Sequence, residues 1–267
     1  MSAPSLEVLG PRIDPRVDPR VGPGGDRPPL LFVPGLGHEA TCWDRWRTAA
    51  TEAGYPAYAM SLRGHGTSEG NVRRARIGQY RDDVIRTALS LPDQPVLVGH
   101  SMGGLVAAMA AARMRVRALV LVAAVPARPA VGSLLTVVRQ HPLDAAGILA
   151  GRTLRMRPEY LYERLDDATA ADYISRCGPE SPIAQYQLIF HRRPGRPLGG
   201  APVLSLAARA DRLVPLADVR ATARHYDAEL IELDDLGHNL MQDEGWELPW
   251  AAAEAWLNRI LGSTVTV

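Results

Sequence analysis

The sequence predicts an α/β protein whose mostly parallel central sheet is flanked by helices and interrupted by a helical insertion. Short apolar runs alternate with helical patterns, the alternation stops between residues 126 and 200, and it then resumes. Strands that are apolar throughout and separated by helices are typical of parallel sheets covered on both faces. A chain of 267 residues suits one large α/β domain or two small ones, and it is long enough to bury a core.

The N-terminal residues 1–29 are rich in proline, which blocks helices and central strands. They contain a tandem repeat, D-P-R-V-D-P-R-V, at Asp14–Val21, which is too short to be a solenoid unit. We therefore expect a proline-rich arm with at most a short edge strand near Leu6–Leu9.

Residues 30–125 alternate between strand and helix patterns. Right-handed crossovers place the loops that follow parallel strands along one rim, so we expect the functional residues there. The predicted strands are Leu30–Val33, Ala57–Leu62, Pro95–Val98 and Ala118–Val125, and the predicted helices are Trp43–Ala53, Ile77–Leu91 and Gly103–Met114.

Residues 126–200 form the predicted insertion, and residues 201–267 complete the core domain that begins with residues 30–125. The insertion starts and ends at strand boundaries on the predicted rim, which favours a helical cap over a second small domain. Its predicted helices are Val131–Arg139, Asp144–Thr153, Pro158–Leu165, Ala168–Cys177 and Pro182–His191. The core then continues with strands Pro202–Leu206 and Glu229–Leu233 and with helices Leu216–Tyr226 and Leu248–Leu261.

The composition excludes several kinds of chemistry. All 30 basic residues are arginine, which removes lysine Schiff bases, pyridoxal-phosphate anchors, P-loop lysines and Ser-Lys dyads. Arginine cannot replace lysine in these roles because it keeps its proton. A net charge of +1 gives no argument for nucleic acid or anionic membranes as partners. Two cysteines form neither a disulfide framework nor a metal-ligand cluster. We expect no bound metal and, separately, no cofactor.

The N-terminus lacks the basic start and apolar run of a signal peptide. The longest apolar runs, Leu105–Ala112 and Ala118–Pro126, are too short to span a bilayer. We expect a cytoplasmic protein whose partner is a small-molecule substrate. The oligomeric state is left open.

A candidate nucleophile lies in P-V-L-V-G-H-S-M-G-G-L, at Pro95–Leu105. The pattern G-x-S-x-G is weak alone, but here it joins a predicted strand to a predicted helix. A serine at such a tight turn needs very small neighbours two residues away, and Gly99 and Gly103 provide them. We interpret Ser101 as the nucleophile. The alternative is an ordinary serine N-cap.

A serine nucleophile needs a base and an orienting carboxylate. His238 follows the last predicted strand on the same rim and is the preferred base, with His38 and His65 as second choices. Asp211 follows the strand Pro202–Leu206 and is the preferred carboxylate. The two aspartates just before His238 are rivals, but they are expected to be solvated turn residues.

An oxyanion hole needs two backbone N–H groups. Met102, after the nucleophile, and Leu36, in V-P-G-L-G-H, occupy the donor positions. A phosphate-binding loop is the competing interpretation, but P-G-L-G lacks its spacing. The remaining candidate substrate-binding residues are two glycines that allow close backbone approach, a loop histidine and two apolar residues of the insertion: Gly35, Gly37, His38, Met156 and Phe190.

Together these motifs resemble the α/β-hydrolase superfamily, in particular its capped serine esterases and lipases, over roughly Leu30 to Leu261. The resemblance rests on V-P-G-L-G-H, L-R-G-H-G-T-S, G-H-S-M-G-G, A-x-x-D-R-L-V-P and L-G-H-N-L-M, and on the chain order Ser, Asp, His. The chain departs from the family at Pro34, where histidine is frequent, and at Ser61, where aspartate is frequent. The second departure should affect loop support more than chemistry.

The resemblance implies a catalytic triad of Ser101, His238 and Asp211. Ser101 argues against dehalogenases and epoxide hydrolases of this fold, which use an aspartate nucleophile, and the missing lysine disfavours plant-type cyanide lyases. We expect a serine hydrolase that cleaves a carboxylic ester or thioester of a small apolar molecule through an acyl-enzyme. Arginine clusters in the insertion could bind an anionic carrier, although such clusters are more often solvated.

Two alternatives remain open at this point. One is an acyl transferase, cyclase or lyase of natural-product biosynthesis that uses the same triad. The other is a ligand receptor without turnover, which an intact triad disfavours.

Overall fold

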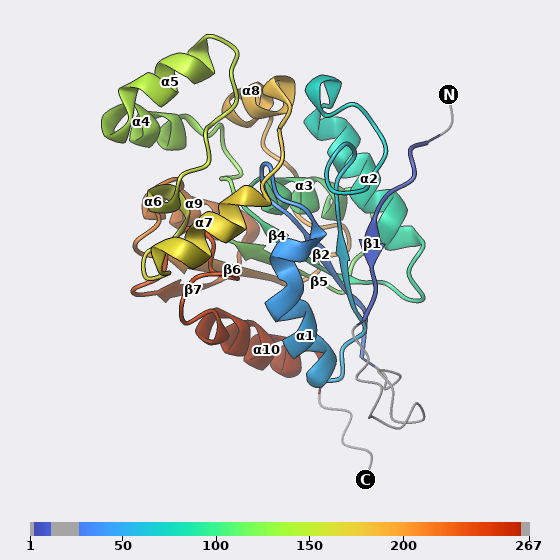
Figure 1. The fold of residues 1–267 in the computed structure, drawn as a ribbon. Coiled ribbons are helices and arrows are strands. Elements are labelled where there is room, and N and C mark those ends of the chain that lie inside the picture. Colours follow the sequence, from blue (N-terminus) through green and yellow to red (C-terminus); the bar gives the residue numbers. More distant parts are fainter. Residues whose placement is uncertain (1–2, 12–26, 263–267) are drawn as a thin grey trace.

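The computed structural model describes residues 3–11 and 27–262, and the repeat at Asp14–Val21 lies outside them. Within the described residues, seven strands form one sheet in the order β1-β3-β2-β4-β5-β6-β7 (Figure 1). Only β1 and β3 pair antiparallel, so the predicted mostly parallel sheet is confirmed. The strands are β1 (Val8–Leu9), β2 (Leu30–Val33), β3 (Ala57–Met60), β4 (Val96–His100), β5 (Ala118–Val122), β6 (Val203–Ala208) and β7 (Glu229–Leu233).

Successive residues of the central strands face two separate hydrophobic clusters. In β2, Leu30 and Phe32 belong to one cluster, and Leu31 and Val33 belong to the other. Both faces are buried, which explains why these strands are apolar throughout. The first face is covered by α1 (Asp44–Glu52) and α10 (Glu247–Leu261), and the second by α2 (Ile77–Leu89), α3 (Met102–Ala111) and α9 (Leu216–Tyr226) (Figure 1).

The short edge strand expected in the N-terminal arm is confirmed. β1 pairs with β3 in the register Val8↔Met60. None of the helices in the described part of the chain is both long enough and apolar enough to cross a membrane.

The segment between β5 and β6 is mainly helical, as predicted, whereas its limits as a separate cap domain stay a prediction. Figure 1 shows α4, α5 and α8 together on one side of the molecule, away from α1 and α10. The helices of this insertion are α4 (Val131–Gln140), α5 (Pro142–Leu149), α6 (Pro158–Leu161), α7 (Asp167–Ser175) and α8 (Pro182–Phe190).

One predicted helix is too long. The helix expected over Pro158–Leu165 ends at Leu161. The backbone N–H groups of residues 163–165 donate to the buried carboxylate of Asp243 at 2.8 to 3.1 Å instead of to helix carbonyls. A side-chain acceptor that takes three backbone donors competes successfully with another helical turn. The other boundaries differ from the predicted ones by a few residues.

Candidate active site

Ser101 occupies the turn between β4 and α3. Its backbone φ is 50°, in the left-handed region that residues other than glycine rarely adopt. Four backbone hydrogen bonds hold it there. Its N–H donates to Val122 at 3.0 Å, and its carbonyl accepts from Gly104 and Val125 at 3.0 Å and from Leu105 at 3.4 Å. The surrounding strands and helix therefore stabilise a conformation that the isolated turn would not favour.

The glycines of G-x-S-x-G permit this turn. A Cβ on Gly99 would lie 2.5 Å from the carbonyl oxygen of Gly103, and a Cβ on Gly103 would lie 2.3 Å from that of Pro34. Neither contact is sterically possible. The absence of a side chain at Gly103 lets the loop after β2, which carries Leu36, pack against the first turn of α3, which begins at Met102.

His238 and Asp211 form a buried pair. His238 Nδ1 lies 2.8 Å from Asp211 Oδ2, and both side chains are only 2% exposed. The other oxygen, Oδ1, accepts from the backbone N–H groups of Leu213 at 2.7 Å and Val214 at 2.8 Å. A carboxylate can only accept hydrogen bonds, so Nδ1 of His238 carries the hydrogen. In the neutral ring, Nε2 is then free to accept a proton.

The three residues follow three different strands: Ser101 follows β4, Asp211 follows β6 and His238 follows β7. The carboxyl ends of parallel strands meet at one edge of the sheet, which places these loops together. Ser101 and His238 line one cavity. The Ser101 hydroxyl makes no hydrogen bond to the part of the chain that the structure describes.

The two backbone N–H groups expected to form the oxyanion hole also have no hydrogen-bond acceptor in the described residues. Leu36 lies in a turn that the N–H of His38 closes by donating to Gly35 at 3.2 Å. Met102 is the first residue of α3, where backbone N–H groups have no partner within the helix. Within residues 3–11 and 27–262, neither the Leu36 N–H nor the Met102 N–H donates a hydrogen bond. An N-terminal helix position favours negative charge.

A buried carboxylate of the insertion holds the loop that carries Leu36. Glu180, which is buried, accepts through Oε2 from the N–H of Gly37 at 3.0 Å. Its Oε1 accepts from the Tyr80 hydroxyl at 2.6 Å and from the Ser181 N–H at 2.7 Å. The N–H of Gly178 donates to the Gly37 carbonyl at 2.8 Å. Both backbone polar groups of Gly37 are therefore bonded to the insertion.

His65 contacts Glu180 and not the Asp211–His238 pair. Its Nε2 lies 3.2 Å from Glu180 Oε2, and both side chains are at most 2% exposed. Burial opposes charge on each group, but the attraction between them prevails, so the pKa of His65 is raised and the pKa of Glu180 is lowered. Sequence reasoning missed Glu180, because G-P-E-S lies in the insertion and matches no catalytic motif.

His38 and His100 act as neutral supports. His38 donates from Nδ1 to the Leu36 carbonyl at 3.0 Å and accepts at Nε2 from the Asn239 amide at 3.1 Å. Burial lowers the pKa of His38 to about 4. His100 donates from Nε2 to the His238 carbonyl at 3.1 Å, and burial, together with the charge of His238, lowers its pKa well below the usual value. These rings therefore position Leu36 and His238.

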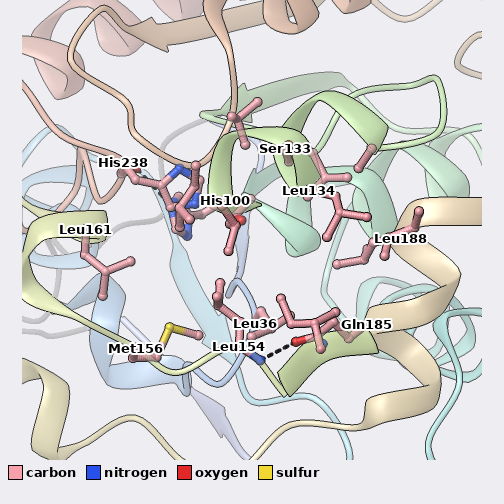
Figure 2. Close-up of a pocket in the computed structure, with 18 of the residues that line it drawn as sticks. Leu36, His100, Ser133, Leu134, Leu154, Met156, Leu161, Gln185, Leu188 and His238 are labelled. Carbon is pink, nitrogen blue, oxygen red and sulfur yellow. Dashed lines mark hydrogen bonds between the residues drawn. The ribbon is translucent and has the colours of Figure 1, made fainter. Parts of the chain in front are cut away.

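An apolar cavity of about 100 Å³ adjoins Ser101 and His238 (Figure 2). A water-sized group needs about 10–15 Å³ of such space, so a group of several heavy atoms fits. Mostly apolar cavities with few polar groups are typical ligand sites. The walls come from the core and from α4, α5 and α8: Leu36, Val125, Ala130, Leu134, Val137, Ile148, Leu154, Met156, Leu161, Leu188, Ile189, Leu213 and Val214.

The expected substrate-binding residues divide into two groups. His38 and Met156 line the cavity, and Gly35 and Gly37 lie in the adjoining loop that carries Leu36. Phe190 does not line it: this side chain is 74% exposed and borders a separate surface hollow. Its α8 neighbours Leu188 and Ile189 face the cavity, and the helical rotation of about 100° per residue turns the next side chain to solvent.

The departure at Ser61 has a structural counterpart. The Ser61 hydroxyl donates to the carboxylate of Glu7, in the N-terminal arm, and accepts from the N–H of Ala40 at 2.9 Å. Thr67 donates to the same carboxylate at 2.9 Å. Glu7 thus brings a carboxylate to the loop position where the family often has aspartate.

Comparison with known proteins gives a family. A family model described as "Alpha/beta hydrolase family" matches residues 30–248. Esterase PIR7B of Oryza sativa subsp. japonica is 36% identical over 111 residues, which cover 39% of this chain and 40% of that protein. Probable esterase PIR7A of Oryza sativa subsp. indica is 36% identical over 103 residues, covering 36% and 38%. The match thus spans less than half the length of these curated relatives.

Solved structures share the fold over nearly the whole chain. A thermophilic esterase from Thermogutta terrifontis gives a TM-score of 0.70 at 20% identity, covering 96% of this chain and 93% of that one. A soluble variant of monoglyceride lipase from Saccharomyces cerevisiae gives 0.74 at 12% identity, covering 97% and 93%. At these identities the likeness concerns the fold alone.

Proposed function

The chain belongs to the alpha/beta hydrolase family, and on that premise we propose that it is a serine hydrolase that cleaves a carboxylic ester or thioester of a small apolar molecule. One observation carries the proposal. Ser101, at a strained strand-to-helix turn, shares an apolar cavity with His238, whose Nδ1 is bonded to the buried Asp211. The esterase names of the rice relatives agree with this chemistry.

In the first half of the reaction, the Ser101 hydroxyl oxygen attacks the substrate carbonyl while Nε2 of His238 takes the hydroxyl proton. His238 thereby becomes an imidazolium, and Asp211 holds this ring through its 2.8 Å contact with Nδ1. The N–H groups of Leu36 and Met102 stabilise the negative oxygen of the tetrahedral intermediate. The intermediate collapses to an acyl-enzyme, and His238 returns the proton to the leaving alcohol or thiol.

In the second half, water attacks the acyl-enzyme carbonyl and His238 takes a proton from that water. The second tetrahedral intermediate expels Ser101, which regains its proton from His238, and the carboxylic acid leaves. The sum is one ester and one water converted to one acid and one alcohol.

The cavity supports a small substrate. A volume of about 100 Å³ accepts a group of several heavy atoms, and its walls are almost entirely apolar. Short esters should therefore be turned over faster than long-chain ones. An anionic carrier bound by the arginine clusters stays a prediction.

A panel of p-nitrophenyl esters of graded acyl length tests the proposal. We expect turnover that is highest for short acyl groups and is lost in Ser101→Ala. The control Ser175→Ala removes a hydroxyl that donates to the Asp172 carbonyl at the exposed end of α7 and should retain full activity. If a fluorophosphonate labels Ser101 but no ester or thioester is hydrolysed above Ser101→Ala, transfer or lyase chemistry replaces hydrolysis.

A further inference from the structure

The cavity wall contains a second hydroxyl, besides that of Ser101, that has no hydrogen-bond partner in the described residues. Ser133, on α4, lines the cavity, and its Oγ is buried without a hydrogen-bond partner in the part of the chain that the structure describes. Figure 2 shows Ser133 among the side chains that line this cavity. Burying a hydroxyl without a partner is unfavourable, so a partner from outside the chain would be stabilising.

Apart from those of Ser101 and His238, the other polar side-chain atoms of the wall either have hydrogen-bond partners in the chain or are covered by backbone. Gln185 accepts through Oε1 from the Leu154 N–H at 2.6 Å and donates through Nε2 to the Arg152 carbonyl at 3.1 Å. His100 Nδ1 is also buried without a partner, but it faces the backbone of Gly35, where an added Cβ would lie 2.8 Å away. Ser133 thus lines the cavity with a hydroxyl that has no partner in the described residues.

A neighbour on α4 shows the ordinary alternative. Thr136 donates from Oγ1 to the carbonyl of Gly132, four residues earlier, at 3.1 Å. Serine and threonine in helices frequently satisfy their hydroxyls in this way. Ser133 makes no such bond, because it lies in the first turn of α4 and the residue four positions earlier, Pro129, precedes the helix.

We propose that Ser133 is a specificity-determining residue that hydrogen bonds an oxygen atom on the part of the substrate enclosed by the cavity. The inference rests on the proposed ester hydrolysis at Ser101 and names a substrate class for it. Preferred substrates carry a carbonyl or hydroxyl oxygen on the enclosed chain, and the apolar walls accept its hydrocarbon. A site built to bond such an oxygen discriminates against the analogue that lacks it, because the hydroxyl is then left unpaired.

The test uses matched ester pairs. On the acyl side, p-nitrophenyl 4-oxopentanoate is compared with p-nitrophenyl pentanoate, and on the alcohol side, 4-oxopentyl acetate is compared with pentyl acetate. In at least one pair, Ser133→Ala should lower kcat/KM for the oxygenated ester roughly five- to fiftyfold more than for the plain one. Thr136→Val, which removes a hydroxyl outside the cavity wall, should leave both ratios unchanged. Equal effects of Ser133→Ala on both members of both pairs would overturn the inference.

A binding measurement separates this inference from the proposed function. Ser101→Ala and the double variant Ser101→Ala/Ser133→Ala are titrated with the same esters by calorimetry. Tighter binding of an oxygenated ester that disappears in the double variant supports the role of Ser133 even if the wild type hydrolyses nothing. Equal affinities in both proteins overturn it, whatever the activity. Ser133→Ala should unfold at nearly the wild-type temperature, since no protein partner is lost.

Discussion

Replacing Glu180 by glutamine should loosen the loop of Leu36 with little change in side-chain shape. The glutamine carbonyl can still accept from Tyr80 and Ser181, as Oε1 does now. Its amide NH₂ then faces the N–H of Gly37, from which Oε2 accepts now, and the ring of His65, whose Nε2 lies 3.2 Å from Oε2. The new NH₂ group is itself a hydrogen-bond donor that faces these donors, so at least one buried N–H group is left without an acceptor.

The magnitude follows from burial. A buried donor left unpaired costs about 1–3 kcal/mol, and removing one partner of a buried ion pair costs about 3–5 kcal/mol. His65 can relieve part of this cost by losing its proton, so we expect about 3 kcal/mol of lost stability. For a chain of this size, that corresponds to a melting temperature lower by roughly 6–12 °C.

The effect on activity should fall on turnover. Removing an oxyanion donor altogether typically costs about 10²–10³ in kcat, and a displaced donor less. We expect kcat of Glu180→Gln to fall roughly 10- to 100-fold and KM to change less, since the cavity walls that come from α4, α5 and α8 do not depend on this loop. Urea denaturation and p-nitrophenyl ester kinetics on the same preparations measure both quantities.

Glu244→Gln is the matched control. Glu244 makes a 3.9 Å contact with Arg164 at the surface, with side chains 63% and 50% exposed, so its loss should cost less than about 1 kcal/mol. If Glu180→Gln matches Glu244→Gln in both stability and kcat, the assigned role of Glu180 is wrong.

Three further predictions concern the same site. The difference in unfolding free energy between wild type and Glu180→Gln, measured by urea titration, should be largest between about pH 4.5 and 6.5. The pKa of His65 is raised, so its contribution to stability is complete below pH 6.5 and is lost at higher pH. The pKa of Glu180 is lowered, so its contribution is complete above pH 4.5 and is lost at lower pH. Gly103→Ala should lose at least about 3 kcal/mol of unfolding free energy, because the added Cβ would lie 2.3 Å from a backbone oxygen. The control Gly78→Ala, whose added Cβ has its nearest neighbour 4.0 Å away, should unfold with nearly the wild-type free energy. Asp211→Asn should lower kcat about 10⁴-fold, because the amide favours the wrong tautomer of the His238 imidazole for its proposed role as the base. A loss smaller than about tenfold would argue against the proposed role of Asp211.

The sheet and the candidate reacting residues could be predicted because their signals are local. Apolar runs between helices define buried strands, and Gly99 and Gly103 mark a turn that only small residues allow. The positions of Asp211 and His238 directly after strands then place them on one rim. Each of these arguments uses residues close together in the chain.

The missed features depend on distant contacts. Glu180 meets Gly37 and His65 from far along the chain, and no local pattern links them. The helix predicted over Pro158–Leu165 was too long because its last N–H groups bond to Asp243, a competitor that periodicity does not reveal. Periodicity likewise identified α8 without showing which of its faces meets the cavity.

The central claim is that Ser101 is an activated nucleophile. Incubating the folded protein with a fluorophosphonate, followed by intact-mass measurement and peptide mapping, tests this most directly. We predict a single adduct, located on Ser101, which disappears in Ser101→Ala and forms far more slowly in His238→Ala. An unlabelled wild-type protein, or an adduct on any other residue, would contradict the claim.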